Sequence, residues 1–217
     1  MLEKLAILII DLSGYTALTE LHGGKKASAI VRQFEEIVRK NVIDQCDIFE
    51  RKGDELLITS LKSSSLVDLV MNLAEEINET TYFPSFHAGM HYGEIYRDNN
   101  QLFGTTINLT SRIQGHSKSG EVLISDAFFE SLGNDRKALF KESERVRFKN
   151  ISNHVKLYKL VHLQSYNETP IDPVCRMQVV DSYFVHRYEN QITYHFCSKE
   201  CLTVFKNDPV IYTHPNI

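Results

Sequence analysis

The cysteines divide this chain of 217 residues into two unequal parts. Cys46 stands alone, whereas Cys175, Cys197 and Cys201 lie in the last fifth of the sequence, after a polar stretch that contains Pro170. The segment beyond Pro170 is dense in Cys, Tyr, Phe and His, but so short a unit buries little apolar surface, and a bound metal would help to hold it together. The sequence therefore predicts a large domain at residues 1–162, a linker at 163–171 and a small domain at 172–217.

The composition excludes several classes of protein. With 42% hydrophobic and 24% charged residues the chain is ordinary globular protein, and a net charge of −4 gives no electrostatic reason to expect nucleic acid as a partner. The apolar run Leu5–Ile10 is ended by Asp11 and is too short for a signal peptide or a membrane span. We therefore expect a cytoplasmic protein with no membrane partner, in which reduced cysteines are metal ligands rather than disulfides.

Strands and helices alternate in the larger segment without a strict βαβ order. The aliphatic run Leu5–Ile10 predicts a strand buried on both faces, and apolar residues recur at helical spacing over Ala27–Val42. Two strands flank a turn at Lys52-Gly53, and another strand is expected at 85–97. This order predicts an α+β domain built on a mixed sheet.

The end of the same segment also has a readable pattern. A helix is expected within 104–117, and a strand at 121–126 precedes a short helix for which Asp126 is a plausible cap. Two strands around Asn150–Asn153 are expected to close the domain.

Two carboxylates stand where predicted strands meet glycine-containing turns, Asp11 and Asp54. Adjacent antiparallel strands can bring them together at one end of a sheet, which is the arrangement that Mg²⁺ or Mn²⁺ requires. Two carboxylates held close repel each other unless a cation lies between them. The alternative is that each aspartate only caps its turn, a position that Asp favours.

A second pair of polar residues lies on the predicted helix. Asn108 and Arg112 are four residues apart and project from the same helical face. An amide beside a guanidinium is suited to holding phosphate oxygens and the charge that develops in phosphoryl transfer. A solvated amphipathic face is the alternative for this pair.

Six segments, in order from Leu5 to Val161, resemble the catalytic domain of class III nucleotide cyclases. "LIIDLSGYT" resembles "DIxGFT", "KGDELLI" resembles "xGDxxMA", "HAGMHYGEI" resembles "RIGIHxGEV" and "LFGTTINLTSRI" resembles "VWGxxVNxASRM". "EVLISD" and "RFKNISNHVKLYKLV" resemble the closing strands of that domain. The resemblance implies the class III cyclase fold, a mixed sheet flanked by helices.

The same resemblance assigns roles to matching residues. Asp11 and Asp54 would bind two Mg²⁺ or Mn²⁺ ions, which serve the attack of the ribose 3′-hydroxyl on the α-phosphorus of a nucleoside triphosphate. Asn108 would orient the ribose, and Arg112 would stabilise the transition state. Lys149 would contact phosphate, although Asn150 replaces the glycine that usually follows. In this family the two sets come from opposite protomers, which implies a head-to-tail homodimer.

Two positions bear on the choice of base. Glu50 falls where adenylyl cyclases carry Lys and guanylyl cyclases carry Glu. Gln101 falls where adenylyl cyclases usually carry Asp or Thr and guanylyl cyclases carry Cys. A carboxylate at position 50 can accept hydrogen bonds from guanine N1–H and N2–H, and it would meet adenine N1 acceptor to acceptor. The pair therefore leans toward guanylate over adenylate but matches neither pattern completely, and a pyrimidine base stays open.

The C-terminal segment has its own resemblance. "DPVCRMQV" and "ITYHFCSKECLTVFKNDPVIY" resemble the YHS domain over 172–212, with Arg176 in place of the usual glycine. That replacement is expected to alter the first turn.

The three late cysteines can converge on a metal. Cys197 ends a predicted strand and Cys201 lies one turn into a helix that Ser198 can cap, so both thiols can meet Cys175. Strand alternation places His195 on the same face as Cys197 and makes it the candidate fourth ligand. Three Cys and a His suit Zn²⁺, whereas three thiolates alone also serve Cu(I) or another soft ion. The alternative is that the cysteines are core residues of a small aromatic module.

These observations lead to one main hypothesis and two alternatives. The main one is a nucleotide cyclase that forms a 3′,5′-cyclic nucleotide and pyrophosphate by two-metal catalysis at a homodimer interface, with a metal-binding YHS-like module. The first alternative is a catalytically inactive cyclase-fold protein that binds a nucleotide or partner and has a metal-sensing C-terminal domain. It draws on the Glu50/Gln101 pair and on the bulky Arg51-Lys52 step. The second is a metal chaperone whose larger domain only dimerises.

Overall fold

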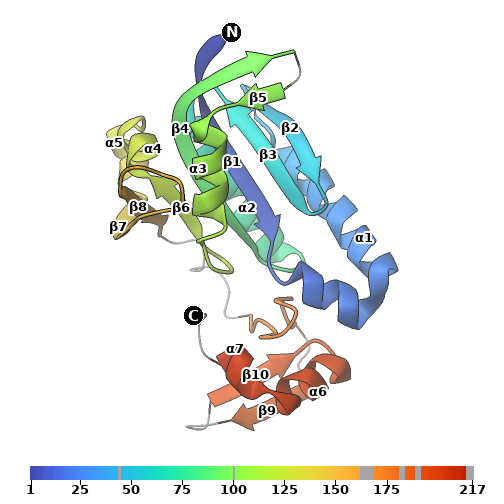
Figure 1. Cartoon of the computed structure of the whole chain (residues 1–217). Helices are drawn as coiled ribbons and strands as arrows, with labels where there is room; N and C mark the ends of the chain where they lie inside the picture. The colour runs from blue at the N-terminus through green and yellow to red at the C-terminus, as the bar shows by residue number, and fades with distance from the viewer. Residues whose placement is uncertain (44, 100, 162–168, 181–183, 189–191, 214–217) are drawn as a thin grey trace.

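The computed structural model describes residues 1–43, 45–99, 101–161, 169–180, 184–188 and 192–213 (Figure 1). Most of the predicted linker and the end of the predicted small domain lie outside these residues. The elements of the larger domain are β1 (Leu2–Leu12), α1 (Tyr15–Asn41), β2 (Cys46–Lys52), β3 (Glu55–Ser60), α2 (Ser63–Glu79), β4 (Phe86–Asp98), β5 (Gln101–Phe103), α3 (Thr105–Gln114), β6 (Val122–Ser125), α4 (Asp126–Glu130), α5 (Asn134–Lys137), β7 (Phe140–Val146) and β8 (Val155–Leu160). Those of the small domain are β9 (Phe184–Tyr188), β10 (Ile192–Phe196), α6 (Lys199–Asn207) and α7 (Pro209–Thr213).

One mixed sheet organises the larger domain. Its strands follow the order β2-β3-β1-β4-β6-β8-β7, and β5 pairs with β4. β4 and β6 are parallel, whereas the other pairs are antiparallel. β1 pairs with both β3 and β4, so the strand predicted from Leu5–Ile10 lies inside the sheet.

Helices cover both faces of β1, which explains its unbroken aliphatic run. Leu8 lies in a buried cluster with Phe34 of α1 and Leu69 of α2. Ile7, which points to the opposite face, lies in a second cluster against which Ile107 of α3 packs. Figure 1 shows α1 and α2 on one side of the sheet and α3 on the other. None of the helices in the described ranges is long and apolar enough to cross a membrane.

The first helix starts earlier than its apolar pattern predicts. α1 begins at Tyr15 rather than at Ala27, and it is bent at Gly23, where φ is 80°. The glycine pair and the lysines that follow it interrupt the apolar spacing, so the sequence pattern conceals the turns from Tyr15 to His22. This segment ends at His22, next to the bend.

Two smaller expectations were also wrong. The cap of α4 is Ser125, whose Oγ accepts a hydrogen bond from the Phe128 N–H at 3.1 Å, and Asp126 is the first helical residue instead. The closing strands are β7 and β8, so Arg147–Lys149 lies in the connection between them rather than in a strand. Lys149 is therefore on an exposed loop.

The small domain has an aromatic core of its own. Phe205 of α6 is fully buried, and the rings of Tyr194 and Phe196 of β10 lie 5.0 and 5.1 Å from its ring centroid. Such ring pairs supply much of the stabilising contact available to so small a unit.

The small domain docks directly on the larger one. Met177 forms a β-bridge with Pro84, and the Gln178 backbone N–H donates to the Phe83 carbonyl at 3.1 Å. The buried Gln178 side chain donates to the carbonyl of Ile77 at 3.2 Å. Met177 and Phe83 belong to the same buried cluster, so the two domains share a hydrophobic core.

Candidate active site and metal centre

The structure brings the two predicted carboxylates together at the end of β1. Ile10 of β1 pairs with Leu56 of β3, so the β2–β3 turn that carries Asp54 lies beside Asp11. Burial, followed by the hydrogen bond and the charge of Asp54, raises the pKa of Asp11 from 3.8 to about 8. A proton between the two carboxyl groups reduces their repulsion when no divalent cation is bound. The carboxylate oxygens are ligands of the kind that Mg²⁺ and Mn²⁺ prefer.

This raised pKa predicts a pH effect on stability in the absence of divalent ions. Because the folded state favours protonated Asp11, its contribution is fully present below pH 4 and is lost as the pH rises through about 8. We expect the melting temperature of the wild type, relative to Asp11→Asn, to fall across that interval. Mn²⁺ should reduce the fall, because it replaces the proton between the carboxylates. Equal pH profiles for the two proteins without metal would contradict the pairing.

A second group of predicted residues surrounds another cavity. Asn108 and Arg112 of α3 and Lys149 of the β7–β8 connection line an open cavity of about 330 Å³. The three side chains belong to exposed residues, so they are available to an anionic ligand. An amide, a guanidinium and an ammonium at one cavity can bind ribose and phosphate oxygens.

The two groups do not line one common cavity in the described part of the chain. The residues lining the second cavity come from α3 and from 149–151, and among the described residues they include neither Asp11 nor Asp54. Glu50 lies on β2 and Gln101 begins β5, and both are exposed outside that cavity. We call the Asp11–Asp54 pair the carboxylate half-site, and Asn108, Arg112 and Lys149 the cationic half-site.

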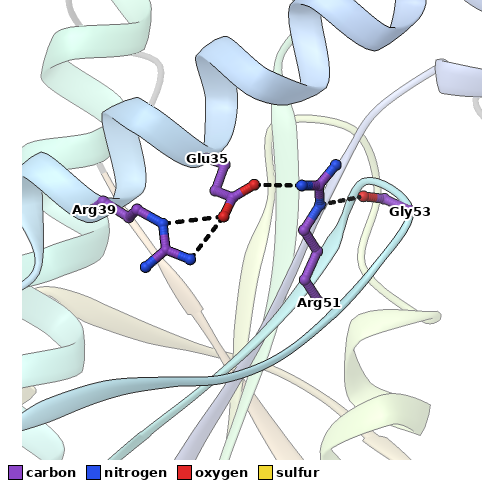
Figure 2. Close-up of polar contacts among 4 residues, drawn as sticks. All are labelled: Glu35, Arg39, Arg51 and Gly53. Carbon is purple, nitrogen blue, oxygen red and sulfur yellow. Dashed lines mark hydrogen bonds and ion pairs between the residues drawn. The ribbon is translucent and has the colours of Figure 1, made fainter.

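The hairpin next to the carboxylate half-site is anchored to α1. Figure 2 shows Arg51 donating to the carboxylate of Glu35, which also accepts from Arg39. The Arg51 Nε–H also donates to the Gly53 carbonyl at 3.1 Å. The Arg51 charge is therefore paired with Glu35, and these contacts join the turn that carries Asp54 to α1.

The three late cysteines converge, as their spacing predicts, and a histidine joins them. The Sγ of Cys197 lies 3.4 Å from that of Cys175 and 3.8 Å from that of Cys201. The Nε2 of His22, at the bend of α1, lies 3.5 Å from Cys197 Sγ and 3.7 Å from Cys201 Sγ. The four ligand atoms all lie within 4.8 Å of one another.

His195, the expected fourth ligand, does not join this group among the described residues. β10 ends at Phe196, so Cys197 lies beyond the strand and the alternation that would pair it with His195 no longer applies. The Nδ1 of His195 is buried without a hydrogen-bond partner in the described part of the chain. The structure therefore brings the histidine of α1 to the thiols instead.

The distances fit a tetrahedral ion. With Zn–S of about 2.3 Å and Zn–N of about 2.0 Å, tetrahedral geometry places two sulfurs about 3.8 Å apart and a sulfur and a nitrogen about 3.5 Å apart. The sulfur–sulfur distances of 3.4 and 3.8 Å and the sulfur–nitrogen distances of 3.5 and 3.7 Å approach these values. Hydrogen bonds from Cys175 and then Cys201 hold the pKa of Cys197 well below its usual value, whereas the hydrogen bond to Cys197 raises the pKa of Cys175. One thiolate is therefore favoured without an ion, and a cation would displace the protons of the other thiols.

A buried carboxylate holds the cysteine loops in place. Asp172 is fully buried, and its Oδ1 accepts from the backbone N–H groups of Val174 and Cys175 at 2.8 and 3.3 Å. Its Oδ2 accepts from the N–H of Cys197 at 2.8 Å. Ser198 caps α6 as predicted, accepting from the Cys201 N–H at 3.2 Å. Asp172 thus joins two segments that carry ligands.

The first turn of this module tolerates an unusual residue. Arg176 has a φ of 61°, in the left-handed region that glycine enters most easily. The turn therefore keeps the conformation that a glycine would favour, although an arginine occupies it.

Comparison with solved structures defines the larger domain. An adenylate cyclase structure from Trypanosoma brucei, described in its monomeric state, matches with a TM-score of 0.67 at 18% identity, covering 83% of this chain and 95% of that one. The larger domain has the class III cyclase fold. Structures of guanylyl cyclase domains share it as well. Residues 171–216 match the YHS domain family model.

Several curated relatives of this cyclase-fold chain are named adenylate cyclase. The pH-sensitive adenylate cyclase MT1302 of Mycobacterium tuberculosis is 24% identical over 131 residues, which cover 60% of this chain and 33% of that protein. An adenylate cyclase of Streptomyces coelicolor is 27% identical over 142 residues, covering 65% and 37%. The chain therefore spans about a third of the length of the curated relatives it matches.

The sequence analysis did not identify two residues of the candidate metal centre, His22 and the bridging Asp172. No spacing rule connects His22 with cysteines at the other end of the chain, and only the docking of the two domains does so. Asp172 stood in a recognised motif, but an aspartate before a proline reads first as a turn residue.

Proposed function

We propose that the chain is a nucleotide cyclase that converts a nucleoside triphosphate into a 3′,5′-cyclic nucleotide and pyrophosphate at the interface of a head-to-tail homodimer, in the cytoplasm. The observation that carries this proposal is the separation of the two half-sites. Asp11 and Asp54 contact each other outside the cavity that Asn108, Arg112 and Lys149 line. Each group lacks what the other would supply, and in this proposal a second copy of the chain supplies it.

In this proposal each residue has a distinct task. Asp11 and Asp54 would hold two Mg²⁺ or Mn²⁺ ions, and these ions would supply positive charge that neutralises the triphosphate and promotes ionisation of the ribose 3′-hydroxyl. Asn108 of the partner protomer orients the ribose so that this oxygen faces the α-phosphorus in line with the leaving pyrophosphate. Arg112 donates to the α-phosphate oxygens as their charge grows, and Lys149 binds the outer phosphates.

The preferred base follows from Glu50. Its carboxylate accepts from guanine N1–H and N2–H, so we propose GTP as the better substrate, whereas the names of the curated relatives point to ATP. Glu50 is exposed on β2 and is free of the ion pair that holds Arg51 to Glu35. Gln101 supplies an amide that can contact either base.

Replacing Glu50 tests this assignment. We expect Glu50→Lys to lower the ratio of kcat/KM for GTP to that for ATP by at least about tenfold, because the ammonium donates to adenine N1 and opposes guanine N1–H. The control is Asp47→Lys, which makes the same charge change on the same strand. An unchanged ratio in Glu50→Lys would remove Glu50 from base selection.

The direct test of the function is turnover. The purified chain is incubated with ATP, GTP, CTP and UTP separately in the presence of Mn²⁺, and the cyclic product and pyrophosphate are measured. We expect cyclisation of one nucleotide above the others. No product from any of the four, with dimeric folded protein, would favour the binding-protein alternative.

A further inference from the structure

The ligand set of the metal centre comes from both domains. Cys175, Cys197 and Cys201 belong to the YHS domain, whereas His22 belongs to α1 of the cyclase-fold domain. The His22 imidazole contacts the sulfurs of Cys197 and Cys201, at 3.5 and 3.7 Å. An ion bound by these four groups would be coordinated by side chains of both domains.

The bend of α1 places His22 at this position. Gly23, directly after His22, has φ 80° and ψ 154°, which ends the first helical segment at the histidine. No atom lies within 4 Å of a Cβ built on Gly23, so space does not require glycine there. Its backbone conformation does, since side chains rarely adopt it. The bend therefore turns the main part of α1 away and leaves the imidazole facing the thiols.

The opposite end of this short helical segment also touches the loop at residues 172–177, which carries Cys175 and which we call the Cys175 loop. A Cβ on Gly14 would lie 2.7 Å from the carbonyl oxygen of Cys175, so the β1–α1 turn packs against the backbone of a ligand. Gly14 has φ 74°, which again favours glycine. The segment from Gly14 to His22 is thus held at both ends by the cysteine site.

Two backbone hydrogen bonds connect the Cys175 loop with the end of β1, next to the carboxylate half-site. The Ser85 N–H donates to the Arg176 carbonyl at 3.3 Å, and the Ser13 N–H donates to the Ser85 carbonyl at 2.8 Å. Ser13 lies two residues after Asp11. Displacement of the Cys175 loop would therefore disturb the turn that follows Asp11.

We propose that one Zn²⁺ ion, bound by His22 together with Cys175, Cys197 and Cys201, fastens the YHS domain to the β1–α1 turn and that binding of this ion activates the cyclase. The regulatory part rests on the proposed cyclase function. Loss of the ion leaves thiolates and an imidazole without a shared cation, frees the Gly14–His22 segment and loosens the support of Asp11. The YHS domain is then a zinc-dependent switch acting on the first residue of the carboxylate half-site.

The first test measures zinc rather than activity. Full-length wild type, His22→Ala, His22→Cys and His195→Ala are stripped of metal, and Zn²⁺ alone is titrated in competition with a chromophoric chelator. We expect one Zn²⁺ per wild-type chain, a loss of affinity of more than about 100-fold in His22→Ala, and little change in His22→Cys, which restores a fourth ligand. His195→Ala should bind as the wild type does. Wild-type affinity in His22→Ala, or a loss in His195→Ala, would overturn the shared site.

The second test measures cyclase activity on the same proteins. With Mn²⁺ present, we expect Zn²⁺-loaded wild type and His22→Cys to turn over at least about tenfold faster than their zinc-free forms, a difference absent in His22→Ala. Equal rates with and without Zn²⁺ in a wild type that binds it would overturn the regulatory step. A wild type that cyclises no nucleotide in either form would overturn the proposed function and the switch with it, while the zinc titration still decides the shared site.

Discussion

A mixture of Asp54→Ala and Arg112→Ala is expected to recover about a quarter of the wild-type cyclase activity, although each variant alone is inactive. Asp54 and Arg112 lie in different half-sites, so a head-to-tail dimer takes one from each protomer. In a heterodimer of the variants one site carries both defects and the other carries neither. Random pairing makes half of the dimers mixed, and each mixed dimer has one intact site of two. Each variant alone should lose at least about 100-fold in kcat.

A matched pair of variants serves as the control. Asn108→Ala and Arg112→Ala change residues of the same half-site, so every site in their mixed dimers carries one defect and no activity should return. The measurement is the rate of cyclic nucleotide formation after subunit exchange, at a protein concentration where sedimentation shows dimers. Recovery in the control mixture, or none in the first, would contradict a site shared in this way.

Much of the cyclase fold could be predicted because its signals are local. The unbroken run Leu5–Ile10 can only be satisfied by burial on both faces, and the structure places it between two strands and under helices on both sides. Likewise, the four-residue spacing of Asn108 and Arg112 fixes them on one face of α3 wherever that helix lies. These features depend on residues that are neighbours along the chain, so the sequence pattern is sufficient to predict them.

The metal centre was only partly predictable because it depends on docking. The convergence of Cys175, Cys197 and Cys201 follows from a strand end and a capped helix, which the local sequence contains. The local sequence does not identify the fourth ligand. Strand alternation predicts His195, but β10 ends at Phe196, one residue before Cys197. His22 reaches the site through a glycine bend and an interdomain contact, and neither has a periodic signature.

Removal of the Asp172 carboxylate is expected to damage both stability and metal binding. In Asp172→Ala the backbone N–H groups of Val174 and Cys175 lose their acceptor in a buried position, and that of Cys197 loses its acceptor in a partly buried one. Unsatisfied buried donors cost about 1–3 kcal/mol each, so we expect the free energy of unfolding to fall by about 3 kcal/mol or more. Since two of these residues carry metal-binding thiols, Zn²⁺ affinity should fall by about 10–100-fold as well.

The damage should be graded by the chemistry of the replacement. Asp172→Asn keeps an acceptor for the loop at Val174 and Cys175, but its amide N–H₂ meets the Cys197 N–H, so an intermediate loss of affinity is expected. Asp208→Ala removes an exposed carboxylate from the same domain and should change neither property. Thermal unfolding and zinc competition on the four proteins measure both. If Asp172→Ala binds Zn²⁺ as tightly as the wild type, the cysteine loops hold their positions without it, and the ion rather than the carboxylate organises the centre.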